Sequence, residues 1–116
     1  MNPNALTTTA RQLAAEPNRK LGVTRLLAAA LLLRQALEDA LDQHWSRTVP
    51  EMRDVSGRAQ LISLPFYLDP RLAGDVNFAW CRLSAACHHD AYELPPSPQE
   101  LERLADIVDK LAVAGG

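Results

Sequence analysis

Apolar residues recur at helical spacing along most of this 116-residue chain. The longest such pattern predicts a helix from Thr24 to about Trp45. Its first half, Leu26 to Leu33, is apolar on every side, as expected of a helix at the centre of a bundle. Its second half is amphipathic, and there Arg34 and Glu38 stand four residues apart, which predicts a solvated surface ion pair.

The same spacing predicts shorter helices on both sides of this one. They are expected over Ala5 to Glu16, from Arg58 to Leu68 with a kink at Pro65, through Asp75 to Tyr92, and from Pro98 to near residue 113. In the helix expected from Arg58 to Leu68, the apolar side consists of Leu61, Ile62, Phe66 and Leu68. Because no alternating β pattern is present, the chain is expected to be all-α, a bundle of four to five helices in one domain, 1–116. Residues 1–20 form either a peripheral N-terminal helix or an arm in this prediction.

Three helix starts carry capping signals. Thr24 is the expected N-cap of the long helix, and Ser97 with Pro98 and Glu100 forms a capping-box pattern. Asp69 followed by Pro70 is a third cap, and Gly74–Asp75 a second start signal, so that residues 70–73 are expected as a separate turn.

The stretch Asp75 to Tyr92 concentrates the residues suited to chemistry. One helical stripe is apolar and is expected to face the core: Val76, Ala79, Trp80, Leu83, Ala86 and Cys87. A second stripe combines an aromatic ring, a cation, a small residue and a titratable ring: Phe78, Arg82, Ala85 and His89. A helix that only covers a core would carry solvated Lys and Glu there. This stripe therefore indicates contact with a partner or a ligand, and Phe78 is expected at a dimer seam or a cleft wall.

The segment RLSAACHHDAY, residues 82–92, resembles the Arg-x4–6-His motif of the HEPN superfamily of small all-α ribonuclease and nucleotide-linked domains. The resemblance implies a HEPN-like fold and a homodimer whose two motifs meet in one cleft. It also implies metal-independent RNA cleavage in a bacterial defence or toxin–antitoxin system. Arg82 would hold the scissile phosphate, and His88 or His89 would move the proton. In some relatives a Tyr after the His is modified with AMP, the place that Tyr92 takes here.

The chemistry of these side chains suits such roles. An Arg fork binds phosphate, and a His titrates near neutral pH. On a regular helix His89 lies about 20° around the axis from Arg82 and His88 about 120°, which slightly favours His89 but leaves both open.

Two other interpretations remain. Arg82 and the two His can form a helix C-terminal cluster in which Asp90 pairs with one of them. Alternatively, the chain is a non-catalytic helical interaction module or assembly subunit whose Phe78–Arg82–Ala85–His89 face binds another protein chain, such as an antitoxin or a defence-system subunit.

The charge and the residue spacing of the chain limit which kinds of partner and ligand are expected. The net charge of −2 and the lack of a basic stripe argue against broad nucleic-acid coating. Cys81 and Cys87 point in different directions on one helix, so they are expected to be free thiols and ordinary buried small residues. No metal is expected, because Cys81, Cys87, His88, His89, Asp90 and a remote His44 lack zinc-ligand spacing. No cofactor is expected either, and the lack of a glycine-rich phosphate loop argues against autonomous hydrolysis of nucleoside triphosphates.

Cell location is also constrained by sequence. The N-terminus does not resemble a signal peptide, and the apolar block Leu26 to Leu33 is too short to cross a bilayer. With two free thiols, this predicts a cytoplasmic protein without membrane contact.

Overall fold

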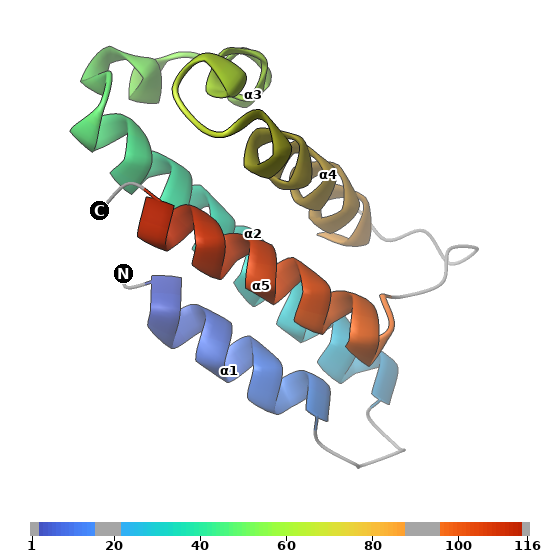
Figure 1. Cartoon of the computed structure of the whole chain (residues 1–116). Coiled ribbons are helices and arrows are strands. Elements are labelled where there is room, and N and C mark those ends of the chain that lie inside the picture. Colours follow the sequence, from blue (N-terminus) through green and yellow to red (C-terminus); the bar gives the residue numbers. More distant parts are fainter. Residues whose placement is uncertain (1–2, 16–21, 88–95, 115–116) are drawn as a thin grey trace.

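Helix α2 (Gly22–Arg47) is the element on which the three other long helices pack. The computed structural model describes residues 3–15, 22–87 and 96–114, and within them it contains α-helices and 3-10 helices but no strand (Figure 1). The predicted all-α bundle is therefore confirmed.

Four long helices form the bundle. They are α1 (Pro3–Ala15), α2, α4 (Pro70–Cys87) and α5 (Pro98–Ala114). Consecutive members run in opposite directions, and α1 closes the ring by packing against α5 (Figure 1). The N-terminal segment, expected as a peripheral helix or an arm, thus packs against both α2 and α5.

The core depends on small residues of α2. Ala29, Ala30, Ala36 and Ala40 are fully buried, and their short side chains let neighbouring helices come close. Larger side chains fill the space between the helices, mainly Leu33, Leu37, Trp45, Leu83, Leu101, Leu104, Val108 and Leu111. Trp45, near the end of the predicted long helix, is fully buried. Leu31, in the stretch expected to be apolar all round, is exposed.

Two of the three predicted caps are present. The Asp69 carboxylate accepts a hydrogen bond from the Arg71 N–H at 3.0 Å, and the Ser97 hydroxyl accepts one from the Glu100 N–H at 3.1 Å. The prediction for Thr24 was wrong, because α2 already begins at Gly22. Adding a turn to an existing helix costs much less than nucleating one, so the Ala- and Leu-rich pattern extends past Thr24.

Helix α4 is continuous from Pro70, so the expected second start at Gly74–Asp75 was wrong. Gly74 has an ordinary negative φ and fits within the helix. The described part of α4 ends at Cys87. Trp80 and Cys87 are half-buried, whereas the other four members of the predicted core stripe are buried.

Pro65 breaks the third predicted helix, as expected. Helix α3 (Gly57–Ser63) is followed by the 3-10 helix η3 (Leu64–Phe66), and the preceding loop contains a further 3-10 helix, η2 (Pro50–Asp54). Two of the apolar residues expected to face inward are exposed instead, Ile62 at 65% and Phe66 at 84%. The change to a 3-10 turn at Pro65 shifts the inward position to Leu64, which is fully buried.

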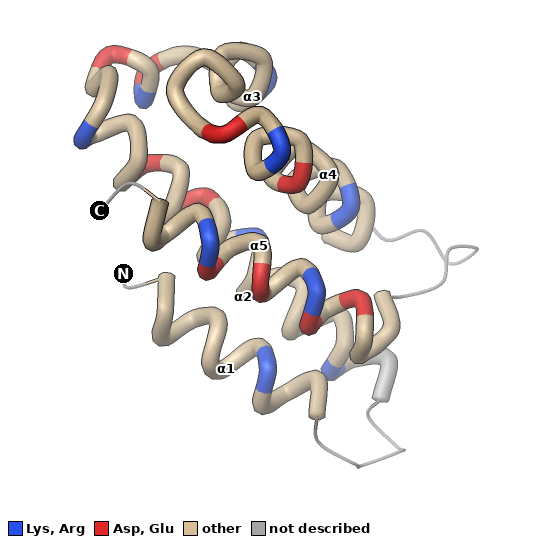
Figure 2. Tube along the Cα trace, in the orientation of Figure 1, with Lys and Arg blue, Asp and Glu red and all other residues tan. Residues whose placement is uncertain are grey.

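Charges are distributed unevenly over the bundle. Both signs occur along α5, while Arg11 is the single charged residue of α1 (Figure 2). None of the helices in the described ranges is both long and apolar enough to cross a membrane.

His44 lies in the core beside Trp45. Its side chain is 3% exposed, and the two rings meet edge to face with centroids 5.1 Å apart. Within the described part of the chain, neither ring nitrogen has a hydrogen-bond partner. Burial lowers the pKa of His44, and the nearby charge of Arg47 lowers this pKa further.

Acid should therefore weaken the fold through His44. In the unfolded chain this ring titrates near its ordinary pKa of about 6.5, but the folded chain resists protonation. The free energy of unfolding should be constant above that pH and fall as the pH drops from about 7 towards the lower folded-state pKa. Urea unfolding at pH 8 and at lower pH values measures this loss.

The His44→Leu variant is the control, since it keeps every other titrating group. It should lose less stability than wild type on acidification. An equal loss in the two proteins would contradict this assignment.

Candidate functional site

Arg82 is held by a carboxylate of the last helix. Its Nε donates to Glu100 Oε2 at 3.0 Å, and its Nη2 lies 2.9 Å from Glu100 Oε1. The two side chains are 30% and 27% exposed. This two-pronged geometry is the strongest arrangement available to an Arg–carboxylate pair. Arg82 thus fastens α4 to the first turn of α5.

The pair changes two expectations drawn from the sequence. Glu100 directs both carboxylate oxygens at Arg82, so its side chain does not complete the capping box that Ser97 begins. Asp90 was expected as a partner for Arg82 or the His residues, whereas the partner that the structure provides for Arg82 comes from α5. A phosphate would have to displace the Glu100 carboxylate or share the guanidinium with it.

Phe78 of the second stripe also lies near α5. Phe78 is 43% exposed, and the Arg103 guanidinium sits 5.5 Å from the centre of its ring. Ala85 is exposed. His88, His89 and Tyr92, the other proposed site residues, lie outside the described residues. The structure therefore brings Phe78 and Arg82 together against α5.

Trp80 anchors the opposite edge of α4. The Arg34 guanidinium lies 4.1 Å from the centre of the indole ring. Arg34 also donates to the Ser84 hydroxyl at 3.0 Å and pairs with Glu38 at 3.2 Å. The predicted Arg34–Glu38 pair is thus present, and it belongs to a half-buried link between α2 and α4.

Gly57 completes the packing around Trp80. A Cβ added at this glycine would lie 3.1 Å from a carbon of the six-membered ring of Trp80. A side chain at this position would require the indole to shift by a few tenths of an ångström.

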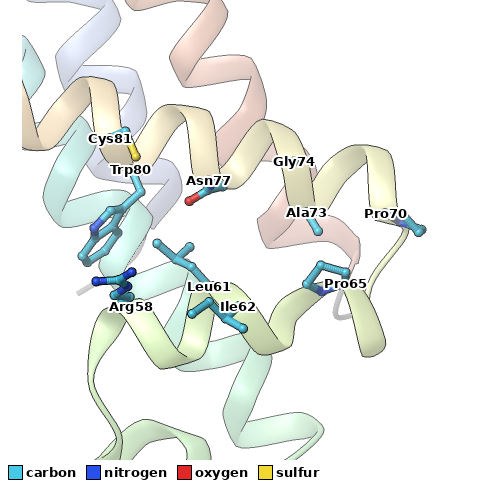
Figure 3. A pocket seen from close by; sticks show the side chains of 10 residues that line it. All are labelled: Arg58, Leu61, Ile62, Pro65, Pro70, Ala73, Gly74, Asn77, Trp80 and Cys81. Carbon is cyan, nitrogen blue, oxygen red and sulfur yellow. The ribbon is translucent and has the colours of Figure 1, made fainter.

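An apolar groove lies between α3 and the outer face of α4, with a volume of about 590 Å³ (Figure 3). Its α3 wall consists of Arg58, Leu61 and Ile62, continued by Pro65 of η3, and its α4 side of Pro70, Ala73, Gly74, Asn77, Trp80 and Cys81. Arg58 lies beside Trp80 at one end, and the two prolines lie at the other (Figure 3). Arg58 is the one charged residue among the ten. The volume falls in the range typical of binding pockets.

Most side chains on the α4 side of the groove are small, so they leave the space above the helix open. A Cβ added to Gly74 would meet nothing within 4 Å. Gly74, Asn77, Cys81 and Ala85 are all exposed. Cys81, expected to be buried, therefore lies at the open groove as a free thiol, while Cys87 is half-buried.

The sequence contained a signal for this groove. Pro70, Gly74, Asn77 and Cys81 follow the i, i+4, i+7, i+11 spacing of one helix face, and none is charged. A solvent-facing stripe without charge is unusual for a helix that only covers a core. The position of α3 beside this stripe could not be read from the spacing.

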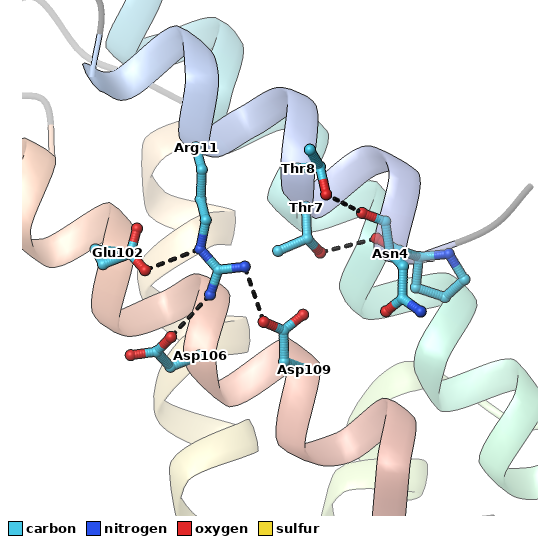
Figure 4. Close-up of polar contacts among 8 residues, drawn as sticks. Asn4, Thr7, Thr8, Arg11, Glu102, Asp106 and Asp109 are labelled. Carbon is cyan, nitrogen blue, oxygen red and sulfur yellow. Dashed lines mark hydrogen bonds and ion pairs between the residues drawn. The ribbon is translucent and has the colours of Figure 1, made fainter.

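A second polar cluster joins α1 to α5 (Figure 4). The Arg11 guanidinium contacts three carboxylates of α5, those of Glu102, Asp106 and Asp109, at 2.7–2.8 Å. Hydrogen bonds to Asp109 and Glu102 raise the pKa of Arg11 against the opposing effect of burial. This cluster therefore has a structural role, because it holds α1 against α5.

No group of three or more His, Cys, Asp or Glu side chains suited to a metal ion occurs among the residues that the structure describes. No family model matches the chain, and comparisons with curated proteins and with solved structures give no match. The groove and the Arg82–Glu100 pair are therefore interpreted from their own chemistry.

The Arg82–Glu100 pair should stabilise the fold measurably. In a double-mutant cycle of Arg82→Ala and Glu100→Ala, we expect a coupling free energy of about 1 kcal/mol, because the pair is two-pronged and half-buried. The cycle removes the separate effect of Glu100 on the α5 dipole. Urea unfolding of the four proteins measures the coupling.

Arg71→Ala, at an exposed position of α4, is the control and should change stability by less than about 0.5 kcal/mol. A coupling energy near zero would contradict the stabilising role of the Arg82–Glu100 pair.

Proposed function

We propose that this protein is a non-catalytic helical interaction module that binds another protein chain through the groove between α3 and α4. The observation that carries the proposal is an apolar groove with the exposed Ile62 on its wall, and with the exposed Phe66 directly after the groove residue Pro65 in the chain. Exposed apolar surface of this kind marks interaction sites, because leaving it in water is unfavourable. The groove lies outside the bundle core, so a partner can occupy it without opening the fold.

The engagement of Arg82 also supports this proposal over RNA cleavage. A ribonuclease of the expected type needs Arg82 directed at a phosphate, but its Nε and Nη2 are directed at Glu100. Phosphate binding at this position would first have to overcome the attraction between Arg82 and a half-buried carboxylate. The net charge of −2 adds no general attraction for RNA.

Site-specific photo-crosslinking in the cells that make this protein tests the proposal. A photoreactive phenylalanine analogue at position 62 lies on the groove wall, and the same residue at exposed position 12 on α1 serves as the matched control. We expect a discrete protein adduct from position 62 and none of that mass from position 12. The captured protein, once identified and purified, should bind the wild-type chain.

Two substitutions at Gly74 test whether the adduct forms in the groove. Gly74→Phe should abolish it by filling the open space above the helix, whereas Gly74→Ala should preserve it. Gly74→Ala should also stabilise the fold by up to about 1 kcal/mol, since Ala favours a helix more than Gly does.

An adduct insensitive to Gly74→Phe, or identical adducts from the two positions, would contradict the proposal. RNA cleavage in EDTA by wild type, lost in Arg82→Ala, would replace it with the ribonuclease hypothesis.

A further inference from the structure

We infer that the groove binds a short amphipathic helix of the partner protein, with an apolar stripe facing α4 and a carboxylate reaching Arg58. This inference rests on the proposed function and specifies the chemistry of the partner. Three features of the groove point to such a helix: the small residues of α4, the length of the groove and the charge at its end.

The shape of the groove favours a helix over a flat surface. Gly74 and Cys81 project little from α4, so the backbone of a second helix can approach closely between α4 and the α3 wall. Leu61 and Ile62 border this space from the other side (Figure 3). An apolar stripe at i, i+3, i+4 and i+7 is the pattern that such helix-binding grooves recognise.

The length of the groove limits the size of the bound helix. At a rise of 1.5 Å per residue, the α4 side from Pro70 to Cys81 is about 16 Å long. That length accommodates about three turns of helix. A segment this short is only marginally helical by itself in water, so it would complete its helix on binding.

The charge at one end specifies the partner further. Arg58 is exposed, and within the described residues its guanidinium has neither a hydrogen bond nor an ion pair. The other lining residues carry no charge, so they neither attract nor repel ions. A carboxylate at the matching end of the bound helix would pair with Arg58, whereas an ammonium group there would be repelled.

Synthetic helices test this inference even before the natural partner is identified. The probes are two stapled peptides of about three turns with leucines at i, i+3, i+4 and i+7. One carries Glu and the other Lys in both the first and the last turn, so that either orientation presents a charge to Arg58. Fluorescence anisotropy at low salt measures the dissociation constant of each peptide.

We expect wild type to bind the Glu peptide about fivefold more tightly than the Lys peptide, a difference of about 1 kcal/mol. Arg58→Ala should remove this preference, and Arg58→Glu should reverse it. Gly74→Phe should weaken both peptides at least tenfold, while Gly74→Ala should bind as wild type does. Circular dichroism of each variant establishes that it is folded.

Equal binding of the two peptides by wild type would overturn the inference, as would binding that Gly74→Phe leaves unchanged. Vesicles of phosphatidylcholine and phosphatidylserine test whether the same surface binds a membrane. If these vesicles bind wild type and neither peptide does, the surface contacts a membrane and the inference is wrong. A groove-dependent photo-crosslink with no peptide preference would leave the proposed function intact and refute the partner chemistry alone.

Discussion

The burial of α2 against three other helices is the constraint on which this structure depends. Its fully buried alanines let α1, α4 and α5 approach closely, and leucines from those helices fill the remaining space. Polar contacts then hold neighbouring helices in register at the surface. Arg11 joins α1 to α5, Arg82 joins α4 to α5, and Arg34 joins α2 to α4.

Two of these links involve side chains of α4. Arg82 is turned to α5, and Trp80 meets Arg34 of α2. The face of α4 that lines the groove carries no charge, and most of its side chains are small. Because Pro65 stops α3 after two turns, the short helix covers only one edge of that face. The groove therefore results from the small side chains of α4 and the short length of α3.

The sequence predicted what local physics determines. The helical class, the Ser97 and Asp69 caps and the break at Pro65 followed from spacing, capping and proline chemistry. Partners brought together by tertiary packing could not be predicted in this way. The pairing of Arg82 with Glu100 joins two helices whose orientation no local pattern specifies. The same limit applies to Cys81, because no local pattern specifies where α3 lies beside α4.

The central claim is that the groove is occupied when this protein performs its function. The most direct test is the alkylation rate of Cys81, relative to Cys87, in intact cells and in the purified protein. Cys81 lines the groove, whereas Cys87 lies half-buried away from it, and burial raises the pKa of the Cys87 thiol, which slows its reaction. Cys87 is therefore an internal reference. We predict that the Cys81-to-Cys87 ratio of labelling falls several-fold in cells. The same ratio in cells and in the purified protein would contradict the claim.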